Sequence, residues 1–489
     1  MSEHSSSDLH SHKKPKNFSP KNTPNKYSIR IFLCKCSQLF IILLFQVFIL
    51  PFVFRTPSES TSVNRNIQEN ITLLQPLESK KCDHGLVYVY DLPPMFNQEL
   101  LDNCRDLDPW HSRCNAISNH GLGPKAAGLS GVPENLVPAW YWTDMFAGEV
   151  IYHDRILKHK CRTTEPESAT AFYIPFYAGL AVGKYLFTNY SAKERDMYCE
   201  RLLKWVHDQP PWKRSNGSDH FIMLGRMTWD FRRSRDEDWG SSFINMPLMK
   251  RVLRLAVERD PWDHLEIGVP YPTGFHPKSK LERDQWLNFV ENRNRTSLFT
   301  FVGGKRKVKG DFRTLLLNHC YNEMGSCRVV DCSGTKCYDG TSEILEAFLD
   351  SDFCLQPRGD AYTRRSTFDC MLAGSIPVFF WKRSIYNQYE WFLGDEPEKF
   401  SVFIDRKDVR NGTSIRKVLE GYSRDEVKKM REKIISYIPK FVYNFVNGDE
   451  VESTNDAFDV AIDGVLRRIH KEKGKKKDGI KLLASRKLT

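Results

Sequence analysis

Short apolar runs alternate with segments of helical apolar spacing from about residue 82 onward. In the first half, apolar runs predict strands at 85–93, 170–179, 219–225 and 265–272. A helix is predicted over 192–208, after Ser191, whose side chain is suited to an N-cap. In the second half, the pattern predicts strands at 297–304, 327–332, 353–356 and 376–381, helices at 311–323 and 342–350, and a helical tail over about 413–470. This alternation favours an α/β fold with two doubly wound, mostly parallel sheets that face a cleft.

An uncharged apolar run precedes this region. Residues 36–54, CSQLFIILLFQVFILPFVF, would span roughly 28 Å as a helix, close to the thickness of a hydrocarbon core. Lys13, Lys14, Lys16, Lys21, Lys26, Arg30 and Lys35 precede it. The positive-inside rule therefore predicts a cytosolic tail over 1–35, a transmembrane signal-anchor over 36–54 and a luminal remainder. A cleaved signal peptide is the alternative, but the run starts late and no small-residue cleavage site follows.

Composition changes this picture only at the ends of the chain. The 489 residues carry a net charge of +11, and a second basic cluster lies at 471–477. The middle is nearly balanced, so nucleic acid is not an expected partner. Residues 55–81 are rich in Ser, Thr, Asn and Gln, which predicts a flexible stem.

Two features support a luminal body. N-glycosylation triplets occur at Asn70, Asn189, Asn216, Asn294 and Asn411. Eleven of the 13 cysteines follow residue 54, which fits an oxidising compartment. The group Cys320, Cys327, Cys332 and Cys337 lacks the C-x2-C spacing of a zinc site, so disulfides are expected. Because eleven is odd, at least one thiol should stay free or pair between chains.

Polar residues cluster between two predicted strands in FCLQPRGDAYTRRSTFDCMLAGSIPVFFW (353–381). A helix is expected to open between Thr363 and Thr367. Helix N-termini and arginine side chains bind phosphate, and a carboxylate can accept hydrogen bonds from ribose hydroxyls. The residues that suit a nucleoside diphosphate are Arg364, Arg365, Ser366, Thr367 and Asp369. The structural alternative is a capped helix with a surface salt-bridge network.

The same stretch resembles the donor-binding signature of plant exostosin-like glycosyltransferases (family 47), within which the xyloglucan galactosyltransferase clade is the most similar. Further motifs that resemble this clade are VYVYDLPPMFN (87–97), YIPFYAGL (173–180), GRMTWDFRR (225–233), WGSSFINM (239–246), PYPTGFHP (270–277) and FTFVGG (299–304). The resemblance runs from about Cys82 to about Phe445. The family commonly carries Glu where this chain has Asp369.

The resemblance implies a GT-B fold, a UDP-sugar donor in the C-terminal domain and an inverting reaction. The expected domains are an acceptor-binding domain at 82–296, a nucleotide-sugar domain at 297–450 and a C-terminal helix with a basic tail at 451–489. The implied enzyme is a single-pass type II protein of the Golgi membrane, with other Golgi glycosyltransferases as possible neighbours. It transfers galactose from UDP-galactose to xylosyl side chains of xyloglucan. The alternatives are UDP-galacturonic acid or UDP-arabinose as donor, or a non-catalytic anchored scaffold or lectin.

Candidate site residues follow from this reaction. An inverting transfer needs a base for the acceptor hydroxyl, and the candidates are Asp230, His120 and Asp91. Gly303, Lys305 and Arg306 end a predicted strand and could approach the pyrophosphate. Arginines could stabilise the leaving diphosphate, so no metal or other cofactor is expected. Three Asp-x-Asp pairs, Asp106/Asp108, Asp236/Asp238 and Asp350/Asp352, are interpreted as structural. Eight of the 11 tryptophans precede residue 263, and one or two are expected in an acceptor groove.

Overall fold

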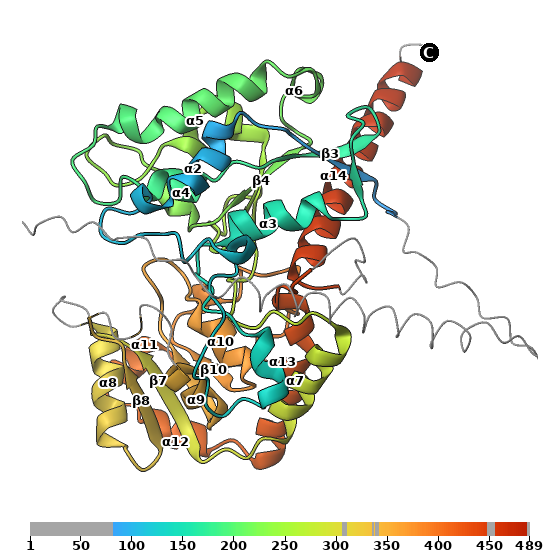
Figure 1. The fold of residues 1–489 in the computed structure, drawn as a ribbon. Coiled ribbons are helices and arrows are strands. Elements are labelled where there is room, and N and C mark those ends of the chain that lie inside the picture. Colours follow the sequence, from blue (N-terminus) through green and yellow to red (C-terminus); the bar gives the residue numbers. More distant parts are fainter. Residues whose placement is uncertain (1–81, 306–310, 335–336, 338–341, 447–454, 487–489) are drawn as a thin grey trace, which may run out of the picture. The chain divides into compact units, whose positions relative to one another are not determined.

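The computed structural model describes residues 82–305, 311–334, 337, 342–446 and 455–486, which contain two parallel sheets (Figure 1). The predicted cytosolic tail, the anchor at 36–54 and the stem lie outside these ranges. Among the residues that are described, no helix is both long and apolar enough to cross a bilayer.

The first sheet has six strands among the described residues, in the order β2-β1-β3-β4-β5-β6. These strands are β1 (Leu86–Val89), β2 (Arg162–Thr163), β3 (Ala169–Ile174), β4 (His220–Leu224), β5 (Leu253–Ala256) and β6 (Glu266–Gly268). The helices in this half are α2 (Gln98–Asp102), α3 (Gly148–Leu157), α4 (Ala178–Gly183), α5 (Ala192–His207) and α6 (Pro210–Ser215). Short 3-10 turns include η3 (Asn119–Gly121) and η5 (Thr228–Phe231).

The second sheet has five strands in the described ranges, in the order β11-β10-β9-β7-β8. They are β7 (Ser297–Gly303), β8 (Cys327–Asp331), β9 (Ser351–Gln356), β10 (Ile376–Phe379) and β11 (Val402–Phe403). Its helices are α7 (Lys280–Asn292), α8 (Phe312–Asn322), α9 (Ser342–Leu349), α10 (Ser366–Leu372), α11 (Arg406–Arg410), α12 (Ile415–Glu420) and α13 (Arg424–Phe441). The last helix, α14 (Ala457–Arg486), follows α13.

Both sheets have the same doubly wound order. Counting strands from the start of each sheet, the spatial order is 2-1-3-4-5-6 in the first sheet and 2-1-3-4-5 in the second, so the winding reverses between β1 and β3 and again between β7 and β9. In sheets of this kind ligands bind beyond the carboxyl ends of the strands at such switch points. The predicted parallel α/β class is therefore confirmed, and the switch points indicate where a site should lie.

Side chains of the first sheet are buried on both faces. Along β3, Ala171 and Tyr173 belong to one apolar cluster, while Phe172 and Ile174 belong to the other. Alternation of this kind places successive residues on opposite faces of a strand. Helices therefore cover both faces, as a doubly wound sheet requires.

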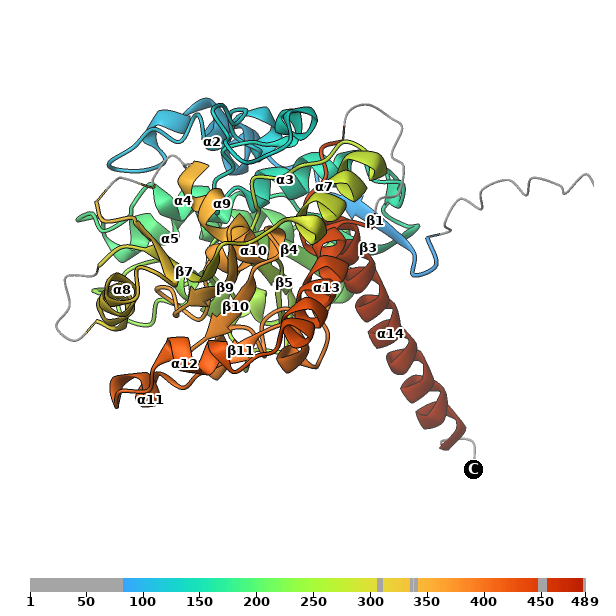
Figure 2. The ribbon, with the colours of Figure 1, turned by 90° about the horizontal axis from the view of Figure 1, so that it is seen from below.

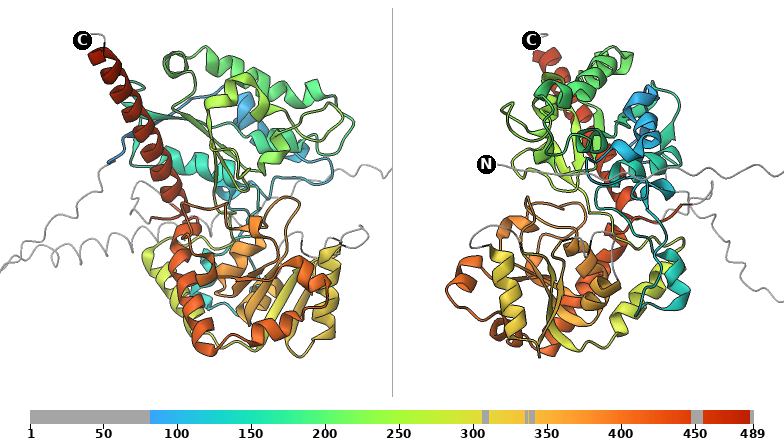
Figure 3. Two further views of the ribbon diagram at one scale, coloured as in Figure 1. Left: turned by 180° about the vertical axis from the view of Figure 1, so that it is seen from behind. Right: turned by 60° about the vertical axis from the view of Figure 1, so that its left-hand side comes forward.

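Helix α14 leads the end of the chain back to the first sheet. It runs beside β3 in Figure 1 and in the opposite view of Figure 3. Lys473 Nζ donates to the carbonyl oxygen of Thr170 at 2.9 Å. At the start of α14, the carboxylate of Asp456 pairs with buried Arg155 of α3 at 2.5 Å. Figure 2 shows α13 beside α7 and α14, in agreement with the contacts among these helices.

Local structure agrees with most predicted elements. Ser191 accepts a hydrogen bond from the Glu194 N–H, and the Glu194 carboxylate accepts one from the Ser191 N–H, which confirms the N-cap. The helical tail predicted over about 413–470 consists of α12, α13 and α14, and α14 continues to Arg486.

Ten of the eleven cysteines beyond residue 54 form disulfides, and Cys199 is free and buried. The pairs are Cys82–Cys161, Cys104–Cys114, Cys320–Cys327, Cys332–Cys337 and Cys354–Cys370. The preference for disulfides over zinc in the 320–337 group is therefore confirmed.

Candidate active site

A pocket of about 190 Å³ lies at the carboxyl ends of β9 and β10. The first residues of α8 and both ends of α11 complete its wall. Its lining residues are Asp311, Phe312, Arg313, Pro357, Arg358, Phe380, Trp381, Arg406 and Arg410. Four of these residues are arginines and three are aromatic, so the pocket combines positive charge with flat apolar surface. This composition suits a phosphorylated ligand with a planar ring.

The segment 357–365, which we call the donor loop, joins β9 to α10. Its Arg364 donates a hydrogen bond to the carbonyl oxygen of Val302 at 3.0 Å. That carbonyl belongs to β7, so Arg364 bridges the switch point between β7 and β9. A Cβ atom at Gly359 would lie 2.2 Å from the carbonyl oxygen of Thr363, so this tight loop requires glycine.

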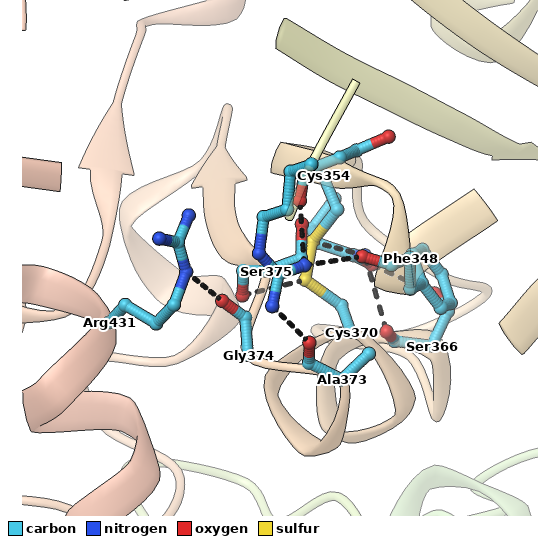
Figure 4. The surroundings of a disulfide bond; sticks show 11 residues. Phe348, Cys354, Ser366, Cys370, Ala373, Gly374, Ser375 and Arg431 are labelled. Carbon is cyan, nitrogen blue, oxygen red and sulfur yellow. Dashed lines mark hydrogen bonds between the residues drawn. A yellow bond between two sulfur atoms is a disulfide. The ribbon is translucent and has the colours of Figure 1, made fainter. Parts of the chain in front are cut away.

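Helix α10 starts within the predicted range, at Ser366, and is held firmly to β9. The Ser366 hydroxyl donates to Gln356 Oε1 at 2.8 Å, and Thr367 is buried. Figure 4 shows the Cys354–Cys370 disulfide between β9 and α10, with the Arg431 side chain bound to the carbonyl of Gly374. Ser366 and Thr367 therefore support the donor loop, and neither lines the pocket.

Arg365 connects the two halves of the structure. Its Nε lies 3.2 Å from Asp369 Oδ2, and its Nη1 donates to the carbonyl oxygen of Thr143 in the first half. Burial raises the pKa of Asp369, and the charge of Arg365 acts in the opposite direction. The two side chains thus form a partly buried ion pair at the start of α10.

Of the remaining predicted donor residues, Gly303 ends β7 and Lys305 follows it. Gly303 lies beside Arg364, whose Nη2 would be 3.4 Å from a Cβ at Gly303. Lys305 is exposed, and Arg306 lies outside the described residues. The pocket-lining arginines on α8 and α11 were missed by sequence reasoning, because only the sheet topology brings them to the donor loop.

The three candidate bases lie in different surroundings. Asp230 is 0% exposed, and its carboxylate accepts hydrogen bonds from Arg226 Nε at 2.6 Å and Trp239 Nε1 at 3.0 Å. These contacts are those of a structural carboxylate, and they disfavour Asp230 as the base. Asp91 is exposed, shortly after the carboxyl end of β1.

His120 has the geometry of an available base. Its side chain is 59% exposed, and Nδ1 lies 2.9 Å from Asp154 Oδ1. Its φ of 59° is in the left-handed region, which is uncommon for a non-glycine residue and often marks functional loops. The same loop is linked to the donor side, because the Thr143 hydroxyl donates to the carbonyl oxygen of Leu122 at 2.7 Å while the Thr143 carbonyl binds Arg365.

A buried carboxylate that sequence reasoning missed also contacts the donor loop. Glu258 follows β5 in the first half and is 2% exposed. It accepts hydrogen bonds from the backbone N–H groups of Tyr362 and Thr363 at 2.7 and 3.2 Å. Burial raises its pKa to about 7.

Most of the tryptophans in the first half are at least partly buried. Trp262 is 65% exposed, and the guanidinium of Arg383 lies 4.7 Å from its ring centre. Arg383 also lies over Trp381, on which Tyr362 stacks with an interplanar angle of 14°. These stacked side chains extend from Trp262 in the first half to Trp381 in the wall of the pocket.

The Asp-x-Asp pairs have local partners. Asp350 pairs with Arg293, and Asp236 pairs with Arg233. Asp108 accepts hydrogen bonds from the N–H groups of Trp110 and His111. Within the described ranges, no three His, Cys, Asp or Glu side chains gather in a group that could hold a metal ion.

Comparison with known proteins shows which family this chain belongs to. Residues 81–419 match the exostosin GT47 domain. Xyloglucan galactosyltransferase XLT2 of Arabidopsis thaliana is 59% identical over 397 residues, which cover 80% of this chain and 76% of XLT2. Xyloglucan galactosyltransferase MUR3 is 38% identical over 85% of this chain and 68% of its own length.

A third relative from the same plant, xyloglucan-specific galacturonosyltransferase 1, is 36% identical over 86% of this chain and 63% of its own length. This chain belongs to the exostosin GT47 family of glycosyltransferases.

Proposed function

We propose that this protein transfers galactose from UDP-galactose to a xylosyl side chain of xyloglucan, with inversion, on a GT-B scaffold. The 59% identity to XLT2 is the observation that carries this proposal. The arginine-lined pocket at the carboxyl ends of parallel strands supports a nucleotide-sugar donor.

The donor is proposed to lie between the pocket and the donor loop. Arg358, Arg406 and Arg410 supply positive charge for the diphosphate, and the charge that develops on UDP as it leaves is stabilised there. Trp381 offers a flat surface to a base or a sugar.

Positive charge from side chains supports a reaction without a metal, and full activity in the presence of EDTA tests this point.

His120 is proposed to deprotonate the acceptor hydroxyl, with Asp154 holding the imidazole by its Nδ1. An exposed imidazole with a carboxylate partner is the arrangement that general-base catalysis uses elsewhere. The acceptor is proposed to lie along Trp262 and Tyr362, because aromatic faces can stack on the apolar faces of sugars.

The protein is proposed to be a Golgi membrane protein with a luminal catalytic part, anchored by residues 36–54. The five disulfides support an oxidising compartment. Protease protection in sealed vesicles tests the orientation.

A donor panel with xyloglucan oligosaccharides tests the reaction. UDP-galactose, UDP-galacturonic acid and UDP-arabinose are each offered, and the products are read by mass and linkage. A hexose added only from UDP-galactose is expected. The galacturonosyl alternative is less favoured because that relative is only 36% identical. Calorimetry that shows no binding of UDP to the wild type would favour the scaffold alternative.

A further inference from the structure

The carboxyl end of β5 is fastened to the second half on both sides of Glu258. The carbonyl oxygen of Val257 accepts a hydrogen bond from the Tyr389 hydroxyl at 2.8 Å. Arg259 and Gln388 exchange two hydrogen bonds, at 2.9 and 3.0 Å, between backbone groups of Arg259 and the side-chain amide of Gln388. The backbone of Glu258 is therefore fixed relative to the second sheet.

The Glu258 side chain makes three hydrogen bonds in this fixed setting. One carboxylate oxygen accepts from the N–H groups of Tyr362 and Thr363, and the other accepts from the Tyr271 hydroxyl at 2.6 Å. Hydrogen bonds to a charged acceptor are stronger than neutral ones, and a buried N–H without its partner is costly. The middle of the donor loop is therefore held by a group from the other half.

The donor loop contributes to the pocket close to this contact. Arg358, four residues before Tyr362, lines the pocket, and Tyr362 itself stacks on the pocket residue Trp381. A shift of the backbone at Tyr362 would move both groups. The loop conformation, and so the shape of the pocket, depends on the Glu258 contact.

We propose that Glu258 is a positioning residue that holds the donor loop in its nucleotide-binding conformation from the opposite half of the enzyme. This inference rests on the proposed UDP-sugar function. Glu258 lies outside the pocket, in the first half of the structure. We assign to it the preorganisation of the donor site.

Glu149 is a closely matched control residue. It allows the positioning role of Glu258 to be distinguished from a general contribution to stability. Glu149 is 1% exposed and accepts hydrogen bonds from the backbone N–H groups of Gly179, Leu180 and Gly225. Burial raises its pKa to about 7, as for Glu258. All three of its hydrogen-bond partners belong to the first half, so Glu149 has no contact of this kind with the donor loop.

The experiment compares Glu258→Gln with Glu149→Gln in the full chain. Calorimetry with UDP is the binding probe, and thermal unfolding is the stability probe. We expect both variants to lower the Tm. Only Glu258→Gln should weaken UDP binding, by about tenfold, and raise the KM for the donor more than it lowers kcat. If folded Glu258→Gln binds UDP within twofold of wild type, or if Glu149→Gln weakens UDP equally, the inference fails.

Failure of the proposed function looks different, because then wild type itself would not bind UDP. A second variant covers the case in which Glu258→Gln does not fold. Tyr271→Phe removes a hydrogen bond that lowers the pKa of Glu258, while Asp360, which raises that pKa, remains. The pH at which UDP affinity declines on acidification should therefore rise. A profile that superimposes on wild type would overturn the inference.

Discussion

Burial distinguishes the roles of similar side chains at the scale of single residues. Asp230 and His120 are both candidate bases, and both pair with a charged group. Asp230 has both oxygens occupied in a fully buried site, whereas His120 is mostly exposed on a strained loop. A base must reach an acceptor hydroxyl, and this difference in exposure is why we propose His120 for that role.

His120→Asn should lower kcat by at least about 100-fold while UDP affinity stays the same, because general-base catalysis contributes about 10²–10⁴-fold. Initial rates and calorimetry measure the two quantities. Asp230→Asn is the contrasting variant. It breaks a buried ion pair with Arg226, so it should cost about 3–5 kcal/mol of stability. Full turnover in His120→Asn would exclude this residue as the base.

Arg358→Ala should weaken UDP binding by about 10-fold to 100-fold, because the arginine lines the pocket and a charge-assisted contact to phosphate would be lost. Arg416→Ala is a suitable control. Arg416 lies on α12 and pairs with Glu420 and Glu323 outside the pocket. Equal UDP affinity of the two variants would show that the diphosphate binds elsewhere.

The ends of parallel strands bring together groups that are distant in sequence. The α8, α11 and β9 ends meet at one pocket, and Gly179 and Gly225 meet at the Glu149 carboxylate. A Cβ atom at Gly225 would lie 2.9 Å from Glu149 Cγ. These glycines allow a carboxylate to be buried against backbone N–H groups.

Glu149 gives a pH prediction with a definite sign. Its pKa is raised from an ordinary value of 4.5 to about 7, so the folded state binds an extra proton between these values. Its contribution to stability is therefore present below about pH 4.5 and is lost as the pH rises through 7. Relative to wild type, Glu149→Gln should become more stable by roughly 3 kcal/mol between pH 4.5 and pH 8.

Unfolding by denaturant at several pH values measures this difference. Glu426→Gln is the control, because Glu426 is an exposed capping residue on α13 whose pKa is lowered. A change of the same sign near pH 7 in the control would contradict the assignment to Glu149.

The sequence predicted strands well where they are continuous apolar runs. The predicted strands at 353–356 and 376–381 are β9 and β10, paired in parallel from Phe353 and Ile376. Strand β5 was missed because it is short and contains Arg254. That side chain is buried and donates to Asp263 at 2.7 Å, a compensation that no local pattern displays.

Only part of the candidate site could be proposed from the sequence, because some of its residues come from distant segments. The donor loop and Arg364 could be named as candidates because their chemistry is concentrated in one stretch. Glu258, Arg406 and Arg410 are isolated in the sequence and meet the loop only through the order of the strands. Contacts between distant segments depend on tertiary packing, which a single sequence does not reveal by periodicity.

Across the whole molecule, four of the five predicted glycosylation sites can be located. Asn189, Asn216, Asn294 and Asn411 are all exposed, and Asn70 lies outside the described residues. Exposure is compatible with glycans at each of the four positions and leaves their occupancy a prediction.

The protein expressed through a secretory pathway should lose mass when it is treated with an N-glycosidase. Each Asn→Gln change at an occupied site should remove one glycan from the mass spectrum. Chain made in a bacterial cytosol provides the unglycosylated reference. Protein from the secretory pathway with no glycan at any of the five sites would contradict the luminal assignment.

The return of α14 to β3 has a consequence for synthesis. Lys473 contacts Thr170 across 303 residues of chain. At roughly 5–20 residues per second, translation needs about 15–60 s to cover that distance. The part of the first sheet that α14 covers at β3 is thus bare while the ribosome completes the rest, and chaperones have access to it during that interval.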